Sequence, residues 1–492
     1  MAIVIPPSRR MQTPAIAARA IVDWVGHRSL SVVAADLAAL PDGHALLQAA
    51  DLIADAADSD DEALRGAGLG ALFGGLVEPL NDGFTPAGRA AYARFFGRIA
   101  WRVVTRTPSL LAALAGAGIV SEAALVARHA QVRGAERHAP ATAQRIVVLS
   151  RVTIGADILL TSVVLQRLHQ RYPQAELILL GDGKLQGLFA GLPNVRVRPI
   201  SYARRGPLRE RLASWMTVVA AVAQERADLV VAPDSRLDQL GLLPVCAVGH
   251  YLLWENLQPE GAAPASLALL LDQWLTRTLN LPAAPTTAPR VALDVAATAV
   301  HQRLRAAFGA APIAAVKLDH GGNQAKALSK EAEMAILRHL RKQGWRVLLD
   351  RGFGADELAN SDALLAELGW QARDIDDSGK GLGLAINALA AGALADADLI
   401  RFHGSIAGWA AALACCGHAL SYDSVGHHLA GALGIPVTVA FTGHFDPAFP
   451  IAWQPRGRAA VQVVEIATAD KNSPQAWQAV FDALPAPNTQ PN

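Results

Sequence analysis

The first 140 residues of the chain carry apolar side chains at helical spacing. Stretches such as AIAARAIVDWV, ALLQAADLIADAA and GRAAYARFFGRIAWRVV place apolar residues three or four positions apart, and no strand-like run interrupts them. The stretch RHAQVRGAERHAPATAQ, at 128–144, is polar and contains Gly and Pro, which is typical of a linker. The pattern predicts a helical leader domain over residues 1–140.

From residue 145 the pattern changes to short apolar runs separated by helical stretches. RIVVLS, AELILLG, NVRVRPIS and ADLVVAP are predicted strands, and ADILLTSVVLQRLHQRYP is a predicted helix between the first two. Runs such as IVVL and LILL have no polar alternation, as expected for strands buried on both faces of a parallel sheet. We predict a Rossmann-like domain over residues 145–285.

A Pro-rich break, LPAAPTTAPR at 281–290, precedes a second series of the same kind. The predicted strands are IAAVKLD, WRVLLD, DLIRF, HALSYD and IPVTVAF, and the predicted helices include SKEAEMAILRHLRKQG, SIAGWAAALACC and one around GLAINALAAGALADA. We predict a second Rossmann-like domain over 290–485 and a disordered tail over 486–492. The expected fold class is α/β, with two Rossmann-like domains facing a cleft and an all-α domain before them.

Composition narrows the function classes. The formal net charge of the 492 residues is +1, so no global field attracts nucleic acid. The three cysteines, Cys246, Cys415 and Cys416, show neither a disulfide framework nor a metal-ligand spacing. Pro6 and Pro7 fall where a signal peptide would have its apolar core, and no uncharged apolar run reaches the ~18 residues that span a bilayer. We expect a cytoplasmic protein that could dock on the inner membrane and has no nucleic-acid partner.

Polar residues concentrate in YDSVGHHLAGALGIP, at 422–436, between two apolar strands. Asp423, Ser424 and Gly426 are predicted at a strand-to-helix turn on the carboxyl edge of a parallel sheet, where α/β proteins bind ligands. The N–H groups of a helix N-terminus favour a phosphate. The alternative is that Asp423 or Ser424 is simply a helix cap. Adjacent helical histidines point about 100° apart and cannot easily share a metal ion.

This stretch resembles the C-terminal signature of glycosyltransferase family 9, the ADP-heptose:lipopolysaccharide heptosyltransferases. The signature runs Asp-Thr-Gly-x-x-His-x-Ala-x-Ala-Leu-Gly-x-Pro, followed by an apolar strand and Asp-Pro. The matching residues are Asp423, Ser424, His428, Ala430, Gly434, Pro436, Asp446 and Pro447. Val425 stands where the family has Gly, and Gly426 follows one place later. The resemblance implies a GT-B fold and places Asp423, Ser424, Gly426 and His428 on the side of the nucleotide-sugar donor.

Two further stretches of the second domain resemble the family pattern. VKLDHGGNQAKALSKE is similar to a Gly-containing loop that ends in Lys, which implies that Lys326 contacts the donor diphosphate. A lysine ammonium is a compact partner for phosphate, although a loop lysine is more often only solvated. LLDRGFGADE is similar to a Gly-rich turn after the next strand and makes Glu357 a candidate for binding ribose or sugar hydroxyls.

The first domain opens with RVTIGADILLTSVVLQRLHQRYPQAEL, which resembles the opening motif of the same family. Asp157 matches the aspartate that is the proposed general base there, while Ala156 replaces the usual Gly. An inverting transfer needs one carboxylate to take the proton from the acceptor hydroxyl, while the opposite domain stabilises the departing diphosphate. The alternative for Asp157 is an N-cap of the helix that follows.

Other charged residues are open to two interpretations. Asp234 and Arg236, in APDSRLDQLGLLP, could contact the acceptor or form an ion pair that closes a loop. The basic run YARRGPLRER, at 202–211, could meet an anionic acceptor or membrane, although such runs are usually solvated. The Asp-x-Asp sequences at 58–62 and 396–398 are expected to be structural, so no metal site and no cofactor are predicted.

The predicted function is metal-independent inverting glycosyl transfer. The sugar, for which heptose is one candidate, would move from a nucleotide-diphosphate sugar such as ADP-heptose to a hydroxyl of a cell-envelope glycan or glycolipid. The alternative is a non-catalytic module that binds a sugar nucleotide or a partner, with the helical leader as its docking arm; Asp157 and Lys326 argue against it. A third hypothesis is a sugar-nucleotide epimerase or hydrolase, for which His403 in RFHGS is a candidate, although a histidine at a strand end is more often structural.

Overall fold

The computed structural model describes residues 13–134, 137–282, 286–318, 326, 328–352, 354–378, 383, 386–444 and 446–487. The chain forms two compact units. The first contains residues 1–152, 177–181 and 199–283, and the second contains 153–176, 182–198 and 284–492. No helix within the described ranges is long and apolar enough to cross a membrane.

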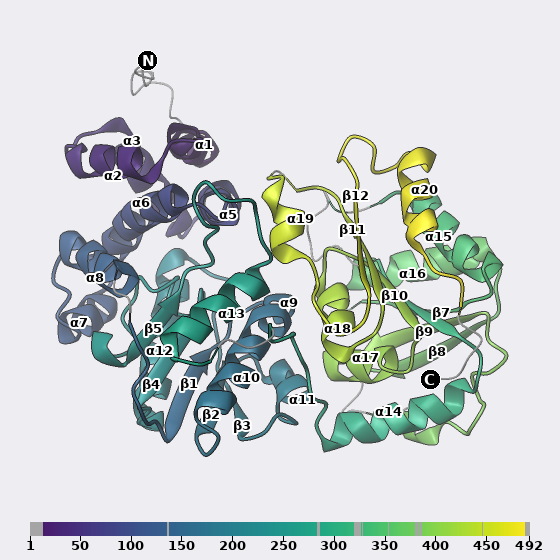
Figure 1. Cartoon of the computed structure of the whole chain (residues 1–492). Coiled ribbons are helices and arrows are strands. Elements are labelled where there is room, and N and C mark those ends of the chain that lie inside the picture. The colour runs from purple at the N-terminus through teal and green to yellow at the C-terminus, as the bar shows by residue number, and fades with distance from the viewer. Residues whose placement is uncertain are drawn as a thin grey trace. The chain divides into compact units, whose positions relative to one another are not determined.

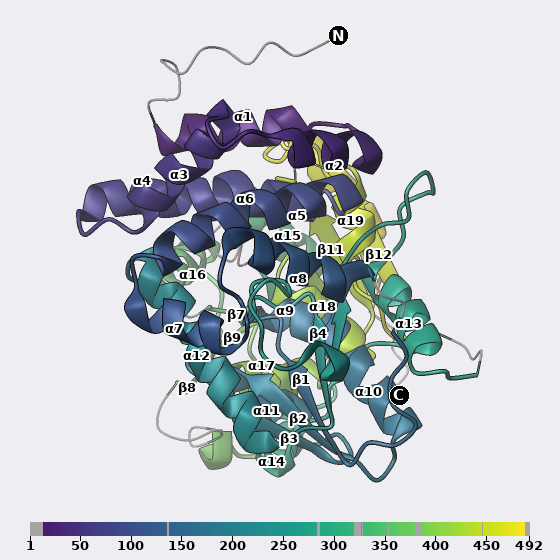
Figure 2. The same ribbon diagram turned by 90° about the vertical axis from the view of Figure 1, so that its left-hand side faces the viewer.

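Every regular element that the structure describes between residues 14 and 134 is helical, as the sequence predicts. The helices are α1 (Pro14–Val25), α2 (Leu30–Ala39), α3 (Ala45–Ala57), α4 (Glu62–Leu72), η2 (Phe73–Val77), α5 (Glu78–Asp82), α6 (Pro86–Val104), α7 (Pro108–Gly116) and α8 (Glu122–Gly134). Thr13, Asp61 and Thr85 cap the helices that follow them by accepting a backbone N–H from the first turn. Helices α1, α2 and α3 pack against α6, which runs beneath them in Figure 2.

The first sheet has five strands in the order β3-β2-β1-β4-β5, the order of a Rossmann-like domain. The strands are β1 (Arg145–Leu149), β2 (Glu176–Gly181), β3 (Val195–Pro199), β4 (Leu229–Pro233) and β5 (Tyr251–Trp254). Strand β4 pairs in parallel with both β1 and β5. The helical segments of this stretch are α9 (Ile154–Ala156), η3 (Asp157–Thr161), α10 (Ser162–Arg171), η4 (Gly183–Leu185), α11 (Gln186–Phe189), α12 (Leu208–Glu225), η5 (Val248–His250) and α13 (Leu267–Thr278).

The helical leader shares a hydrophobic core with this sheet. Buried side chains of α1, α3, α6 and α8 form one cluster with side chains of β1, β2, β4 and α12, and α6 and α7 contact the sheet's helix α12, beside which α7 lies in Figures 1 and 2. Two polar contacts add to the packing. The buried Arg89 of α6 donates to the carbonyl oxygen of Glu255 at 2.7 Å, and the Tyr92 hydroxyl donates to the carbonyl oxygen of Gln239 at 3.0 Å. The leader is therefore packed as part of the first unit.

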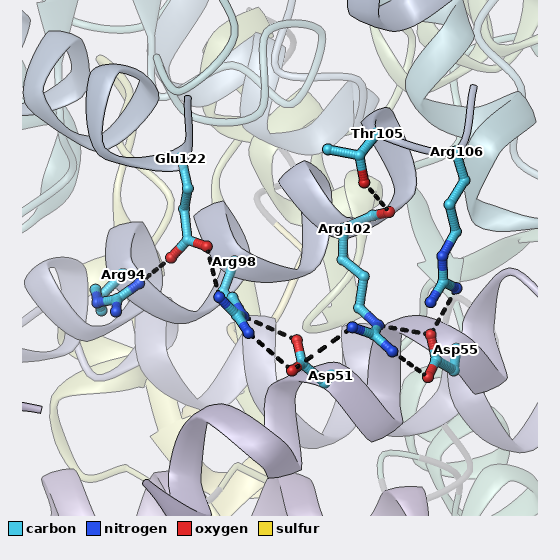
Figure 3. A network of polar contacts seen from close by, with 8 residues as sticks. All are labelled: Asp51, Asp55, Arg94, Arg98, Arg102, Thr105, Arg106 and Glu122. Carbon is cyan, nitrogen blue, oxygen red and sulfur yellow. Dashed lines mark hydrogen bonds and ion pairs between the residues drawn. The ribbon is translucent and has the colours of Figure 1, made fainter. Parts of the chain in front are cut away.

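Helices α3 and α6 are also joined by a row of ion pairs (Figure 3). Arg98 binds both carboxylate oxygens of Asp51, at 2.8 and 2.9 Å, and Arg102 binds both oxygens of Asp55, at 2.7 and 2.8 Å. Glu122, at the start of α8, accepts from Arg98 at 3.0 Å. Bidentate guanidinium–carboxylate pairs fix orientation as well as distance, so this row sets the alignment of α3 on α6.

The second sheet has seven strands in the order β12-β11-β10-β6-β7-β9-β8, and all neighbouring pairs are parallel. The strands are β6 (Ile313–Lys317), β7 (Arg346–Asp350), β8 (Ala372–Asp377), β9 (Leu399–Gly404), β10 (His418–Tyr422), β11 (Val437–Phe441) and β12 (Val461–Glu465). The helical segments are α14 (Val295–Phe308), α15 (Lys330–Lys342), α16 (Ala355–Leu368), η7 (Ile386–Ala388), α17 (Ile406–Leu413), α18 (Val425–Leu433), α19 (Ala448–Trp453) and α20 (Pro474–Ala483).

Helices α15, α16 and α20 contribute to one hydrophobic core on this sheet, while α17 and α18 contact β9 and β10. The strand order reverses between β6 and β10, which makes this position the topological switch point of the domain. Two parallel sheets after an all-helical N-terminal region confirm the predicted GT-B fold class. The predicted domain boundaries remain a prediction.

One predicted helix, around GLAINALAAGALADA, is wrong over the residues that the structure describes there. Only Ile386–Ala388 forms a 3-10 turn, and turns follow up to residue 396. Gly392 has a φ of 72°, and its N–H donates to the carbonyl of Ala306 at 2.9 Å, while that of Leu394 donates to Ala307 at 3.0 Å. Bonds to the end of α14 therefore replace the bonds of a continuous helix. Residues 488–492 of the predicted tail lie outside the described residues.

Candidate functional site

The polar stretch at 422–436 forms the turn between β10 and α18. Ser424 is the N-cap of α18: its hydroxyl accepts from the N–H of Gly426 at 3.4 Å, and its own N–H donates to His427 Nδ1 at 3.1 Å. Gly434 ends the helix in the left-handed region, with a φ of 76°. The alternative that Ser424 caps the helix is thus correct. This role is compatible with a ligand site, because the capped turn still lies at the carboxyl edge of the sheet.

Gly426 occupies a position where a side chain does not fit. A Cβ atom there would lie 2.8 Å from Ser421 Oγ and 2.9 Å from Lys317 Cδ. Ser421 and Lys317 are register partners on β10 and β6, the two strands that flank the switch point. Ligands of open α/β sheets bind outside the carboxyl ends of the strands at such a point. Helix α18 therefore comes close to β6 and β10 at the point where a ligand is expected.

Lys326 and Asp423 form an ion pair at this helix end. The Lys326 ammonium contacts the Asp423 carboxylate and lies 3.5 Å from the Asp423 carbonyl oxygen. The two side chains are 18% and 11% exposed, and Nζ lies 5.6 Å from the ring centroid of Phe449. Residues 319–325 and 327 of the predicted phosphate loop lie outside the described residues. The structure thus brings Lys326, Asp423, Ser424 and Gly426 together, as the sequence suggested.

His427 and His428 are buried in the first two turns of α18. Their ring centroids are 3.9 Å apart, and the His428 ring meets Trp453 edge-on at 6.2 Å. Burial lowers the pKa of both imidazoles, and neighbouring His427 and Lys326 lower that of His428 further. Both rings are therefore neutral near pH 7. No three His, Cys, Asp or Glu side chains gather as metal ligands in the part of the chain that the structure describes.

Asp157 lies inside a continuous helical segment. The segment begins at α9, whose N-cap is Thr153, and Asp157 has helical dihedrals, with φ −65° and ψ −40°. The N-cap alternative is therefore wrong. Asp157 is 1% exposed, and its carboxylate accepts from Thr161 Oγ1 at 2.7 Å. Asp157 is a buried acceptor with a fixed orientation.

The turn that carries Asp157 packs on α18. A Cβ at Gly155 would lie 3.1 Å from Cδ2 of His428 and 3.5 Å from Cα of Val425. Both segments belong to the second unit, although residues 153–176 come from the stretch of the first sheet. The predicted base and the predicted donor residues are therefore in one compact unit.

Glu357 closes its own turn. Its Oε2 accepts from the N–H of Gly354, the N-cap of α16, at 2.9 Å. Gly352 before it has a φ of 73°, and a Cβ there would lie 2.3 Å from Glu357 Oε2. The structure places Glu357 after β7, the strand next to β6, with its carboxylate already capping a helix.

Asp234 is buried between two arginines of the first unit. It is 2% exposed, and its oxygens lie 2.7 Å from Arg89 Nη1 and 2.8 Å from Arg151 Nη1. Arg236 is half-buried, and its charge acts on Asp82, on α5: burial raises the pKa of Asp82 to about 6, and the charge of Arg236 opposes this rise. The ion-pair partners of Asp234 are therefore Arg89 and Arg151, and not Arg236, which lies two residues further along the chain.

Sequence analysis missed Arg89, Arg151, Lys317 and Asp350. Lys317 and Asp350 are charged residues at the ends of apolar strands, and Arg151 comes just after one, so their positions could have indicated them. Nothing in the apolar helix around Arg89 points to a contact with a residue more than a hundred positions away.

The remaining charged candidates have structural partners. Arg209 of the basic run binds the carbonyl oxygen of Asp58 at 2.8 Å and pairs with Asp60, both within the first acidic stretch. In the second, Asp398 pairs with Arg341. His403 Nδ1 lies 3.3 Å from the Asp376 carboxylate, at the ends of neighbouring strands β9 and β8.

No protein-family model matches the sequence, and no curated protein sequence matches it significantly. Among solved structures, it is similar to a glycosyltransferase family 9 protein from Veillonella parvula, with 14% identity, 72% of this chain and 94% of that chain covered, and a TM-score of 0.49.

Two Escherichia coli enzymes are similar to the same extent. ADP-heptose lipopolysaccharide heptosyltransferase II has 15% identity, with 69% of this chain and 97% of that chain covered and a TM-score of 0.47. Heptosyltransferase WaaC, solved with ADP, has 16% identity, with 69% and 100% covered and a TM-score of 0.47. At these values the likeness does not extend to ligands or residue roles.

Proposed function

We propose that the chain is a metal-independent inverting glycosyltransferase that uses a nucleotide-diphosphate sugar. The observation that carries the proposal is the Lys326–Asp423 pair at the N-terminus of α18, beside the switch point of the second sheet. A cation and a helix N-terminus that meet at this edge suit a diphosphate. The resemblance of this stretch to glycosyltransferase family 9 supports the same conclusion.

On the donor side, each residue has a separate role in the proposal. Lys326 would turn its ammonium from Asp423 to the diphosphate and stabilise the charge that grows on the leaving group. Gly426 lets α18 pack closely on Lys317 and Ser421, and this packing holds the backbone N–H groups of the helix N-terminus at the sheet edge where the phosphate would bind. The buried, neutral His428 holds the helix against the turn of Asp157, and Glu357 would orient a hydroxyl of the ribose or sugar.

On the acceptor side, Asp157 is the proposed general base. It takes the proton from the acceptor hydroxyl as the oxygen forms the new bond to the anomeric carbon and the bond to the diphosphate breaks. Arg236 is the proposed acceptor contact, with Asp234 fixing the loop that carries it. A heptose as sugar, a cell-envelope glycan or glycolipid as acceptor, and a cytoplasmic site at the inner membrane complete the proposal.

Calorimetric titration with ADP, UDP, GDP and ADP-heptose tests the donor site. Wild type is expected to bind one of these ligands, and Lys326→Ala to bind it at least tenfold more weakly. Lys330→Ala is the matched control, because Lys330 is a partly exposed lysine four residues further along the chain that pairs with Glu367; the affinity of this variant for the ligand should equal that of wild type. A wild type that binds none of the four at millimolar concentration would sink the proposal.

Transfer itself is tested with the ligand that binds. Hydrolysis or transfer of the labelled sugar should be lost in Asp157→Asn while the affinity for the donor is kept. Tight binding with no turnover under any acceptor condition would instead favour the non-catalytic module.

A further inference from the structure

A second lysine–aspartate pair lies beneath the proposed donor site. Lys317 pairs with Asp350, and their side chains are only 2% and 5% exposed. A buried ion pair gives up the hydration of both charges, and well-packed apolar side chains in its place are often equally stable. Stability alone therefore does not explain a charged pair at this position.

The stem of Lys317 lies under the first turn of α18. Lys317 is the last residue of β6 and the register partner of Ser421 on β10, at the switch point. Its Cβ and Cδ would be 3.2 and 2.9 Å from a Cβ at Gly426. The height of this turn above the sheet is therefore set by the Lys317 side chain.

The other end of the pair holds the turn after β7. Asp350 is the last residue of that strand, and while its Oδ2 pairs with Lys317, its Oδ1 accepts from the N–H of Gly352 at 3.1 Å. Gly352 has a φ of 73°, which turns the chain back toward Glu357. The pair thus joins two turns that both carry proposed donor residues.

We propose that Lys317 is a positioning residue for the donor diphosphate. Its stem supports Gly426 and its ammonium holds Asp350, so that the N-terminus of α18 and the turn after β7 keep one fixed arrangement. The inference rests on the proposed function, and Lys317 is too buried to touch the donor itself. Its effect should therefore fall on the affinity for the diphosphate group that every nucleoside-diphosphate sugar shares.

The double variant Lys317→Met/Asp350→Asn tests this role. Methionine keeps an unbranched stem under Gly426, asparagine keeps an oxygen for the Gly352 N–H, and no unpaired charge stays buried. Calorimetric titration with ADP and with inorganic pyrophosphate should give dissociation constants at least tenfold above those of wild type, by the same factor for both. Equal affinity in the double variant and wild type, or a change for ADP alone, would overturn the inference.

Arg346→Met is the matched control. Arg346 is a buried cation at the opposite, amino end of β7, where it donates to the carbonyl oxygen of Leu394 at 2.6 Å. Its loss should lower the melting temperature without changing either dissociation constant. A loss of affinity equal to that of the double variant would assign the effect to general loosening of the sheet.

Gly426→Ala tests the same contact from the other side, whether or not the double variant folds. Folded Gly426→Ala with wild-type affinity for pyrophosphate would also overturn the inference. If wild type binds neither probe, the proposed function and this inference both fail. If wild type binds and only Lys326→Ala loses affinity, the inference alone fails.

Discussion

Gly155 and His428 meet where the turn of Asp157 packs on helix α18: a Cβ at Gly155 would lie 3.1 Å from the His428 ring. Gly155→Leu adds atoms to this closed contact. We expect it to lower turnover at least tenfold and stability by about 1–3 kcal/mol, because overpacking displaces the turn. Sugar-transfer assays and urea unfolding measure the two effects. Gly66→Ala, at a position in α4 with no atom within 4 Å of the new Cβ, is the control: it should keep wild-type turnover and should raise stability by at most about 1 kcal/mol, because Ala favours a helix interior.

Asp234→Asn should destabilise the first unit by about 3–5 kcal/mol, since it leaves Arg89 and Arg151 buried without their shared anion. Arg236→Ala should leave the melting temperature nearly unchanged and raise KM for the acceptor. Thermal unfolding and acceptor kinetics separate the two roles. A stable Asp234→Asn protein with a raised acceptor KM would instead make Asp234 a direct acceptor contact.

Glu333, on α15, should make the second unit less stable as pH rises. Burial raises its pKa from 4.5 to about 7, against a hydrogen bond from Asn360 Nδ2 at 3.0 Å. The unfolded chain therefore releases this proton first, and the free energy of unfolding falls between pH 4.5 and 7. Glu333→Gln removes this loss, so it should be more stable than wild type by about 1–3 kcal/mol at pH 8 and equal to it near pH 4. If the free energies of unfolding of wild type and Glu333→Gln, measured by urea unfolding, differ by the same amount at every pH, the prediction is wrong.

The row of ion pairs in Figure 3 should respond to salt and acid. Burial opposes the ionisation of Asp55, but hydrogen bonds from Arg102 and Arg106 outweigh it and lower the pKa. The stabilisation is thus present above pH 3.8 and is lost as pH falls through the lowered pKa. Because Asp55 is partly exposed, a double-mutant cycle of Asp55→Asn and Arg102→Met should give a coupling of about 1 kcal/mol at low salt. A coupling unchanged in 1 M salt would contradict the electrostatic origin.

The periodicity of apolar residues predicted the helices and strands whose burial pattern does not depend on particular distant partners. The apolar spacing of α6 and the continuous apolar runs of β1 and β10 were sufficient, because burial dictates those patterns whatever the neighbours are. The error at 386–397 has a different origin. There the backbone bonds to α14 replace helical bonds, and such long-range partners leave no periodic trace in the sequence.

The candidate site was predictable to the same degree. Asp423, Ser424 and Gly426 follow an apolar strand directly, so their place at the sheet edge followed from topology. The partners of Asp234 did not, because Arg89 lies 145 positions away on a helix of the leader. Pairing across such distances depends on tertiary packing, which one sequence does not encode in local spacing.

The bond from Arg89 to the carbonyl of Glu255 spans 166 positions, and this bears on how the protein is made. At roughly 5–20 residues per second, a ribosome needs on the order of 10–30 s to synthesise that interval. During this time the first sheet is incomplete, because its strands are made between residues 145 and 254, and the apolar faces of the nascent helices are open to chaperones and to neighbouring chains. Slow refolding and aggregation of early intermediates should therefore originate in the part of the molecule that is synthesised first.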